Sequence, residues 1–150
     1  MRAVIQRVLG AQVTIDGKIH AKIKQGLLIF IGIENSDSRN DIEYLASKVC
    51  NLRIFSDVDG KMNLNLRETE GEILVVSQFT LHAKTKKGNR PSFIKAATPE
   101  YAIPIYNGFC TELETLLQKP IQTGEFGANM KINLVNDGPV TILIDSKDKQ

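Results

Sequence analysis

The residues best suited to chemistry in this chain end an apolar stretch, in the segment Ser77-Gln78-Phe79-Thr80-Leu81. An apolar strand that ends in hydroxyl and amide side chains leaves backbone N–H groups free at a sheet edge. Donors fixed where negative charge develops are what an oxyanion hole needs, since they stabilise the intermediate of ester hydrolysis. Taken alone, the five residues favour a simpler interpretation, which is an ordinary strand end with solvated hydroxyl groups.

A second segment, Asn136-Asp137-Gly138-Pro139-Val140-Thr141, lies between two stretches typical of strands. Its Gly138-Pro139 pair predicts a turn. A cis bond occurs at only about 5–6% of X-Pro bonds in folded proteins, so the sequence leaves the geometry of this bond open.

Conventional sets of catalytic residues are absent from the sequence. A Ser-His-Asp hydrolase is not expected, because there is no Gly-x-Ser-x-Gly elbow and the only histidines are His20 and His82. His20 stands between lysines in a short strand, so we expect it to be solvated. His82 directly follows the expected strand 72–81, which contains Ser77. Scattered carboxylates and single histidines indicate no metal site, and no glycine-rich phosphate loop is present. Two cysteines, Cys50 and Cys110, exclude a disulfide framework and fit a reducing cytosol.

Charge is unevenly distributed, although the net charge of the 150 residues is only +2. Residues 73–99 contain no acidic side chain and five basic ones, which are Lys84, Lys86, Lys87, Arg90 and Lys95. A near-neutral total can therefore conceal the basic patch that a phosphate-bearing partner requires. Charge alone favours a solvated loop whose lysines keep it soluble.

Length and composition predict one globular domain that forms a core without disulfides. We assign it to residues 1–145 and expect a frayed polar tail over residues 146–150. The longest apolar stretch, 27–33, is far shorter than the ~20 residues of a membrane helix. Arg7 stands where a signal peptide would be apolar, so we expect a cytoplasmic protein without a membrane segment.

Two helices and a set of short strands must position the two segments. A stripe of apolar residues from Ile42 to Leu52 predicts the first helix, and Thr98-Pro99-Glu100 predicts the start of the second. The second helix is expected to end before Pro120, with Pro104 as the site of a kink. Strands are expected at residues 3–9, 12–15, 18–23, 27–33, 53–55, 62–66, 72–81, 130–135 and 140–145.

These elements indicate a mixed α+β fold with a single domain. We expect a mostly antiparallel or mixed sheet that closes toward a barrel, with the two helices packed on it. The 27–33 run is expected to be buried on both faces. Asp57-Val58-Asp59-Gly60 resembles part of a calcium loop, but the bidentate Glu is missing, so we interpret it as a plain turn.

Three motifs together resemble those of the D-aminoacyl-tRNA deacylase family. They are Ser77-Gln78-Phe79-Thr80-Leu81, Lys87-Gly88-Asn89-Arg90-Pro91-Ser92-Phe93 and Asn136-Asp137-Gly138-Pro139-Val140-Thr141. Shorter matches are Ile5-Gln6-Arg7-Val8, Arg53-Ile54-Phe55-Ser56-Asp57 and Thr123-Gly124-x-Phe126-Gly127-Ala128-x-Met130, where x is any residue. The resemblance runs from residue 1 to about 145 in the order of the family. One departure is Lys84, where many members carry Asp or another small polar residue, and it affects only the charge of the loop.

The resemblance implies a homodimeric cytoplasmic hydrolase that needs no cofactor and no metal. Its substrate would be the acceptor end of an aminoacyl-tRNA, where it cuts the ester between a D-amino acid and the terminal adenosine. The catalytic wall would consist of Ser77, Gln78, Phe79 and Thr80. Backbone N–H groups around Phe79 and Thr80 would hold the ester carbonyl oxygen.

Substrate binding, by the same resemblance, involves both copies of the chain. Gly138 and Pro139, cis in the family, would reach into the other subunit's pocket and leave no room for an L side chain. Arg7 would brace that pair, and Phe126 and Met130 would lie near the adenine. A D- and an L-aminoacyl ester carry the same groups, so rigid backbone that excludes one shape can discriminate between them.

Catalysis is then expected to come from positioning and oxyanion stabilisation. No base is evident to activate Thr80, so we expect attack by water, aided by the neighbouring ribose 2′-hydroxyl. Glycyl-tRNA is an ambiguous substrate because glycine has no side chain to reject. Two other functions stay open, a non-catalytic RNA-binding module and an esterase for an acidic small molecule held by the basic residues of 84–95. The intact motifs favour the deacylase.

Overall fold

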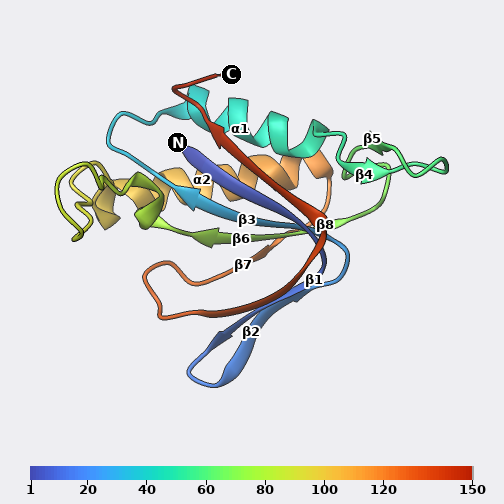
Figure 1. The fold of residues 1–150 in the computed structure, drawn as a ribbon, viewed down its shortest axis with the longest axis horizontal. Helices are drawn as coiled ribbons and strands as arrows, with labels where there is room; N and C mark the ends of the chain where they lie inside the picture. The colour runs from blue at the N-terminus through green and yellow to red at the C-terminus, as the bar shows by residue number, and fades with distance from the viewer. Residues whose placement is uncertain (150) are drawn as a thin grey trace.

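A strongly curved sheet of six strands forms the centre of the computed structural model, which describes residues 1–149 (Figure 1). The strand order is β2-β1-β3-β6-β7, and β8 pairs with the other side of β1. Its strands are β1 (Arg2–Ile15), β2 (Lys18–Ile23), β3 (Gly26–Gly32), β6 (Glu72–Ser77), β7 (Gln122–Thr123) and β8 (Lys131–Asp145). Antiparallel pairs join β1 to three neighbours, whereas β3, β6 and β7 run parallel. The expected mixed sheet is therefore confirmed.

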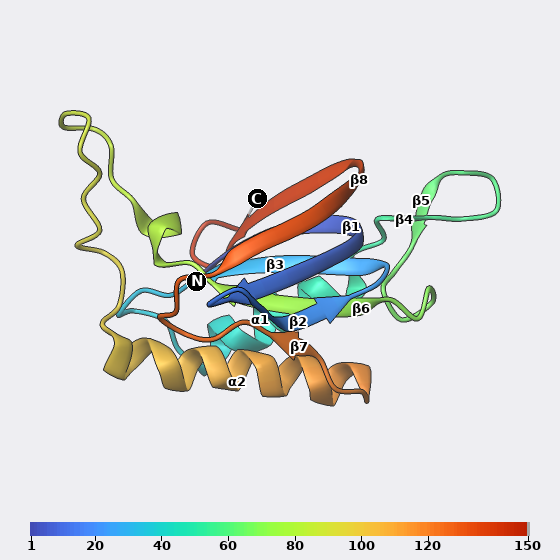
Figure 2. The same cartoon turned by 90° about the horizontal axis from the view of Figure 1, so that it is seen from below.

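Two helices, α1 (Arg39–Asn51) and α2 (Pro99–Leu117), lie on the same side of the sheet, and α2 is the one farther from β8 (Figure 2). At the start of α1, the backbone N–H of Ser38 donates to the Asp41 carboxylate at 2.8 Å, which satisfies one end of a capping box. Thr98 and Pro99 begin α2 as predicted, and Pro104 lies within its second turn. The sequence signals for both helices are local, which explains why both were predicted correctly.

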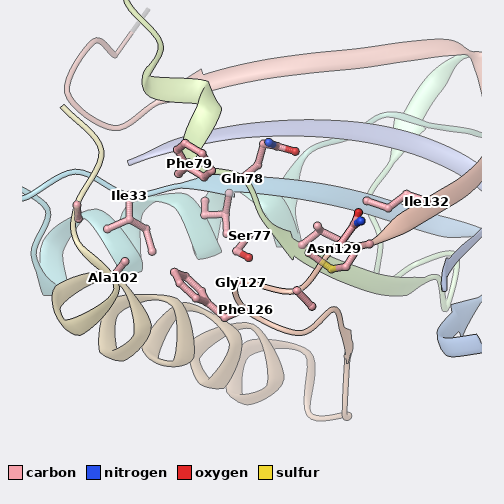
Figure 3. A pocket seen from close by; sticks show the side chains of 14 residues that line it. Ile33, Ser77, Gln78, Phe79, Ala102, Phe126, Gly127, Asn129 and Ile132 are labelled. Atoms are coloured by element: carbon pink, nitrogen blue, oxygen red, sulfur yellow. The ribbon is translucent and has the colours of Figure 1, made fainter. Parts of the chain in front are cut away.

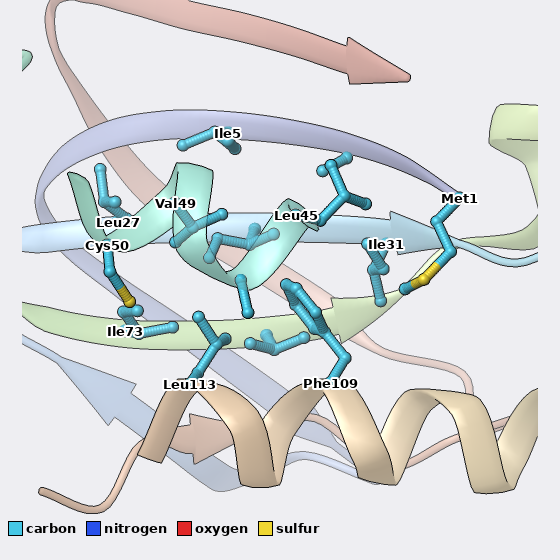
Figure 4. Close-up of a cluster of buried hydrophobic side chains, with 14 of the residues drawn as sticks. Met1, Ile5, Leu27, Ile31, Leu45, Val49, Cys50, Ile73, Phe109 and Leu113 are labelled. Atoms are coloured by element: carbon cyan, nitrogen blue, oxygen red, sulfur yellow. The ribbon is translucent and has the colours of Figure 1, made fainter. Parts of the chain in front are cut away.

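The main core fills the space between the helices and the sheet (Figure 4). Phe109 and Leu113 of α2 and Leu45 of α1 are fully buried there, against Leu27 of β3. The opposite face of β3 contributes Leu28 to a second cluster under β1 and β2. The 27–33 run is thus buried on both faces, as expected. Its side chains contribute to both hydrophobic clusters.

A short outer hairpin consists of β4 (Phe55–Ser56) and β5 (Met62–Leu64). Its turn is the calcium-like segment, and the Asp57 carboxylate accepts the N–H groups of Asp59 and Lys61 at 2.9 and 3.0 Å. These hydrogen bonds, first that from Lys61, lower the pKa of Asp57. One oxygen of this carboxylate, Oδ1, therefore stabilises its own turn.

The strand expected over 72–81 is four residues too long. Pairing with β3 stops at Ser77, and Phe79–His82 form a short 3₁₀ helix, η1. The last bond across the sheet is from the N–H of Gln78 to the carbonyl of Ile31, at 2.8 Å. Beyond that point β3 has ended, so no neighbour remains to extend the ladder. Residues expected as two strands, 3–9 and 12–15, form instead one continuous β1 with shifts in register toward β2 and β8.

The turn predicted at Gly138-Pro139 is wrong, because β8 continues through it as a single strand. Gln6 pairs with Thr141 and Val8 with Asn136, so the intervening residues form a bulge opposite Arg7. The Asn136 side chain accepts the N–H of Val140 at 2.9 Å and closes the bulge. Gly138 has a φ of 126°, and its bond to Pro139 is cis.

The tail expected to fray at residue 146 is instead anchored. Ser146 is buried, and its hydroxyl donates to Asp41 at 2.7 Å and accepts from the Met1 ammonium group at 2.8 Å. The ammonium group also forms an ion pair with the buried Asp37, and Lys147 donates to Asp41 at 2.8 Å. The polar residues at this end form hydrogen bonds and ion pairs with buried groups. Composition alone does not reveal such pairing. Gln150, the last residue of the expected tail, lies outside the described residues.

Candidate active site

A cavity of about 290 Å³ opens where β6 ends (Figure 3). Ser77 and Gln78 enter it from the strand end, Phe79 from η1, and Phe126 from the loop that joins β7 to β8. None of the 14 residues that line it carries a charge. A pocket of this kind recognises a ligand by shape and by hydrogen bonds rather than by ion pairs.

The cavity brings together five of the nine predicted site residues, which are Ser77, Gln78, Phe79, Phe126 and Met130. Thr80 instead lines an adjacent groove, together with Arg2 and Leu143. The remaining three, Arg7, Gly138 and Pro139, line neither space.

Two backbone donors at the edge of the cavity have no acceptor. The N–H of Gln78 bonds to β3, and the N–H of Leu81 bonds back to the Gln78 carbonyl at 3.3 Å. Between them, the N–H groups of Phe79 and Thr80 have no hydrogen bond to any residue of 1–149. The first turn of any helix leaves such donors free. Adjacent unbonded N–H groups beside a pocket are the arrangement an oxyanion hole requires.

The Thr80 hydroxyl accepts a hydrogen bond from the Gln78 side-chain amide at 2.5 Å. Within the described chain it makes no hydrogen bond to an imidazole or a carboxylate. His82 follows two residues later, but it is buried, it does not line the cavity, and its Nε2 has no partner among residues 1–149. The surroundings of Thr80 therefore contain no group placed to remove its proton.

Phe126 has a fixed place in the cavity wall. Its ring meets that of Tyr106 edge to face, with centroids 5.8 Å apart. The Tyr106 hydroxyl donates to the Val75 carbonyl of β6 at 3.0 Å, and burial raises the pKa of this hydroxyl above its usual value. Tyr106 is thus held as a neutral donor, and it holds Phe126 against the sheet.

Arg7 connects the bulge of β8 to the outer hairpin. Its guanidinium, which is 8% exposed, donates to the carbonyls of Asp137 at 3.1 Å and Ile54 at 2.6 Å. The Asp137 carboxylate lies 3.2 Å from Nε of Arg7. A Cβ added at Gly138 would lie 2.9 Å from Nη2, so a side chain there would displace the guanidinium. Arg7 therefore fixes the position of the Gly138-Pro139 segment.

The basic residues of 84–95 lie on a long loop that extends away from the sheet and α2 (Figure 2). All five basic side chains are exposed. The loop begins beside the cavity, where the Phe79 and Phe93 rings meet edge to face at 5.1 Å. Lys84 and Ser92 exchange backbone hydrogen bonds across it at 2.8 and 3.0 Å.

Asn129 is a pocket residue that the sequence analysis did not single out, although it stands between two that it did. The sequence signal that could have identified Asn129 is its position shortly after two glycines, Gly124 and Gly127. Gly127 has a φ of 80°. Over the described chain, no group of three or more His, Cys, Asp or Glu residues is placed to hold a metal ion. No helix within residues 1–149 is long and apolar enough to cross a membrane.

A family model described as D-Tyr-tRNA(Tyr) deacylase matches residues 4–145 of this chain. The chain belongs to this family. A D-aminoacyl-tRNA deacylase of Flavobacterium psychrophilum is 63% identical over 150 residues, and one of Parabacteroides distasonis is 61% identical. Both alignments cover 100% of this chain and of the relative.

Two solved structures share this fold. A c-Myc DNA unwinding element binding protein is 39% identical, with a TM-score of 0.91 over 97% of this chain and 98% of its own. A probable eukaryotic D-amino acid tRNA deacylase is 17% identical, with a TM-score of 0.81 over 95% of this chain and 97% of its own. At that lower identity the similarity supports the fold alone.

Proposed function

We propose that this protein hydrolyses the ester bond of D-aminoacyl-tRNA and releases a free D-amino acid and tRNA. Membership of the deacylase family and full-length similarity to curated D-aminoacyl-tRNA deacylases support this activity. The structural observation that carries it is the pair of unbonded N–H groups at Phe79 and Thr80, beside an uncharged pocket. That pair suits an ester carbonyl whose oxygen becomes negative during attack.

In the proposed mechanism a water molecule attacks the ester carbonyl carbon. The carbonyl oxygen becomes an oxyanion held by the Phe79 and Thr80 N–H groups. When the intermediate collapses, the bond to the ribose 3′-oxygen breaks, and that oxygen takes up a proton to restore the tRNA hydroxyl. The Thr80 hydroxyl is bonded only to the Gln78 amide and not to a protein base. We therefore assign assistance in the proton transfer to the neighbouring ribose 2′-hydroxyl.

Chiral selection is proposed to need a second copy of the chain. Gly138 and Pro139 of that copy would enter the cavity with backbone alone, where an L side chain would clash and a D side chain would not. The support is that Arg7, which is almost fully buried, holds this segment in place by bonds to two carbonyls. The exposed basic loop would contact phosphates of the acceptor end. The cytoplasm is the proposed compartment, and both cysteines are free.

Three substrates test the function. The protein is incubated with D-Tyr-tRNA, with L-Tyr-tRNA and with the free ethyl ester of D-Tyr, and released tyrosine is measured. We expect release from D-Tyr-tRNA only. No release from any substrate would indicate a binding module, and rapid cleavage of the free ester without chiral preference would indicate a small-molecule esterase. Glycyl-tRNA, added as a fourth substrate, is expected to be cleaved because it presents no L side chain.

A further inference from the structure

Gly32 is the last residue of β3, and η1 packs directly against this end of the strand. A Cβ added at Gly32 would lie 3.0 Å from the Gln78 carbonyl oxygen and 3.0 Å from the Leu81 Cβ. It would also lie 3.1 Å from Cδ2 of the His82 ring, which is buried. Non-bonded carbon atoms pack at about 3.5–4.0 Å, so there is no room for a side chain between the strand and η1. The close approach therefore requires glycine.

The atoms that meet Gly32 cannot move away one at a time. The Gln78 N–H donates to the Ile31 carbonyl at 2.8 Å, and the Leu81 N–H donates to the Gln78 carbonyl at 3.3 Å. Arg2, which pairs with Gly32 across β1 and β3, donates from Nη1 to the Leu81 carbonyl at 3.0 Å. The contacts at Gly32 involve a backbone oxygen and a Cβ rather than the far end of a flexible side chain. A side chain at this position would therefore displace η1 as a unit.

The two unbonded donors belong to the segment that Gly32 contacts. We propose that Gly32 is a positioning residue for catalysis, because its lack of a side chain seats η1 on β3 and so fixes the Phe79 and Thr80 N–H groups. An oxyanion donor is effective only at about 2.7–3.1 Å from the oxygen on which charge develops, so small displacements of η1 matter. This inference rests on the proposed function, since the position of the donors affects the rate only if such an oxyanion forms.

Gly32→Ala tests the proposal, because one methyl group requires η1 to move by a few tenths of an ångström. Single-turnover hydrolysis of D-Tyr-tRNA is expected to slow about tenfold, since a misplacement of about 1 Å can cost 10²-fold. Binding is measured with two D-Tyr analogues of the adenosine ester. One has an amide in place of the ester, and the other has a phosphonate whose negative oxygen replaces the oxyanion.

The two analogues separate a positioning role from a general loss of structure. The phosphonate resembles the charged intermediate, so its affinity for Gly32→Ala is expected to fall about tenfold, in step with the rate. The neutral amide resembles the ground state, and its affinity is expected to change less than about twofold. Partial unfolding would instead weaken both analogues equally.

Gly10→Ala is the matched control, because Gly10 is also a strand glycine and its added Cβ would lie 3.4 Å from the nearest atom, the Ile23 carbonyl oxygen. It is expected to keep the rate and both affinities, and thermal melting checks that the variants fold. Should Gly32→Ala not fold, the same comparison is made with Arg2→Met. That variant removes the bond to the Leu81 carbonyl without inserting an atom between β3 and η1.

Three results would overturn the proposal. The first is an unchanged rate in a folded Gly32→Ala variant, and the second is an equal loss of affinity for both analogues. If only Arg2→Met folds, an unchanged rate in that variant is the third. An unchanged protein that cleaves no D-aminoacyl ester would refute the proposed function itself, and the role of Gly32 with it.

Discussion

Two polar regions of this protein differ in how completely their groups are paired. At one end of the sheet, the Met1 ammonium group, Asp37, Asp41 and Ser146 are buried and bonded to one another. Beside the cavity, the backbone N–H groups of Phe79 and Thr80 have no hydrogen bond to any residue of 1–149. A buried charge without a partner is strongly destabilising, so the fold depends on the pairing in the first region. The second keeps its donors unbonded, and that is what a binding site requires.

Asp37→Asn is expected to have the largest effect, since it leaves the buried ammonium group without its counter-charge. Removing one partner of a buried ion pair costs about 3–5 kcal/mol in the free energy of unfolding. Urea denaturation followed by circular dichroism measures this loss. The control is Asp59→Asn on the exposed turn, for which about 0.5 kcal/mol or less is expected. Similar stabilities for the two variants would show that the paired region does not stabilise the fold.

Phe79→Pro tests the unpaired region, because proline removes one backbone N–H. Loss of a single oxyanion donor typically lowers kcat about 10²–10³-fold. Phe79→Ala is the matched control, since it removes the exposed ring but keeps the N–H, and most of the activity is expected to remain. Single-turnover hydrolysis of D-Tyr-tRNA compares the two. If both variants lose activity equally, the ring matters and the backbone donor does not.

The pH dependence of stability separates the regions further. Burial opposes ionisation of Asp41, but hydrogen bonds from Lys147, Ser146 and Ser38 outweigh it and hold the pKa well below its usual value. Because the folded pKa lies below the unfolded one, the contribution of Asp41 is complete above about pH 4 and is lost as the pH falls further. Urea denaturation between pH 2 and 6 should therefore show a smaller acid loss in Asp41→Asn than in the unchanged protein. Parallel curves would contradict this role for Asp41.

Thr80→Val is expected to have the smallest effect. It replaces the hydroxyl by a methyl group, and the Gln78 amide that loses its acceptor is near solvent. If water is the nucleophile, kcat should change less than about tenfold, because no covalent role is lost. Complete loss of activity, with an acyl-enzyme trapped in the unchanged protein, would show that the hydroxyl attacks the ester.

The sequence predicted those elements that are determined by residues close to one another in the chain. Thr98 and Pro99 begin α2 because the cap and the first turn lie within a few residues of each other. The strand end at 77–81 carries two unbonded backbone N–H groups, those of Phe79 and Thr80, and the chain forms the 3₁₀ helix Phe79–His82 after Gln78.

Long-range contacts decided the rest. The sequence by itself determined the fold class, both helices, the basic loop and the motif that carries the unbonded donors. Only the tertiary structure decided that Gly138-Pro139 forms a bulge, because the choice between turn and bulge depends on both flanking stretches pairing with β1. Only it decided that Ser146 is buried and that Asn129 joins the cavity, since each depends on partners far away along the chain. Periodicity reports which face of an element is apolar, but it cannot report which distant group completes a hydrogen bond.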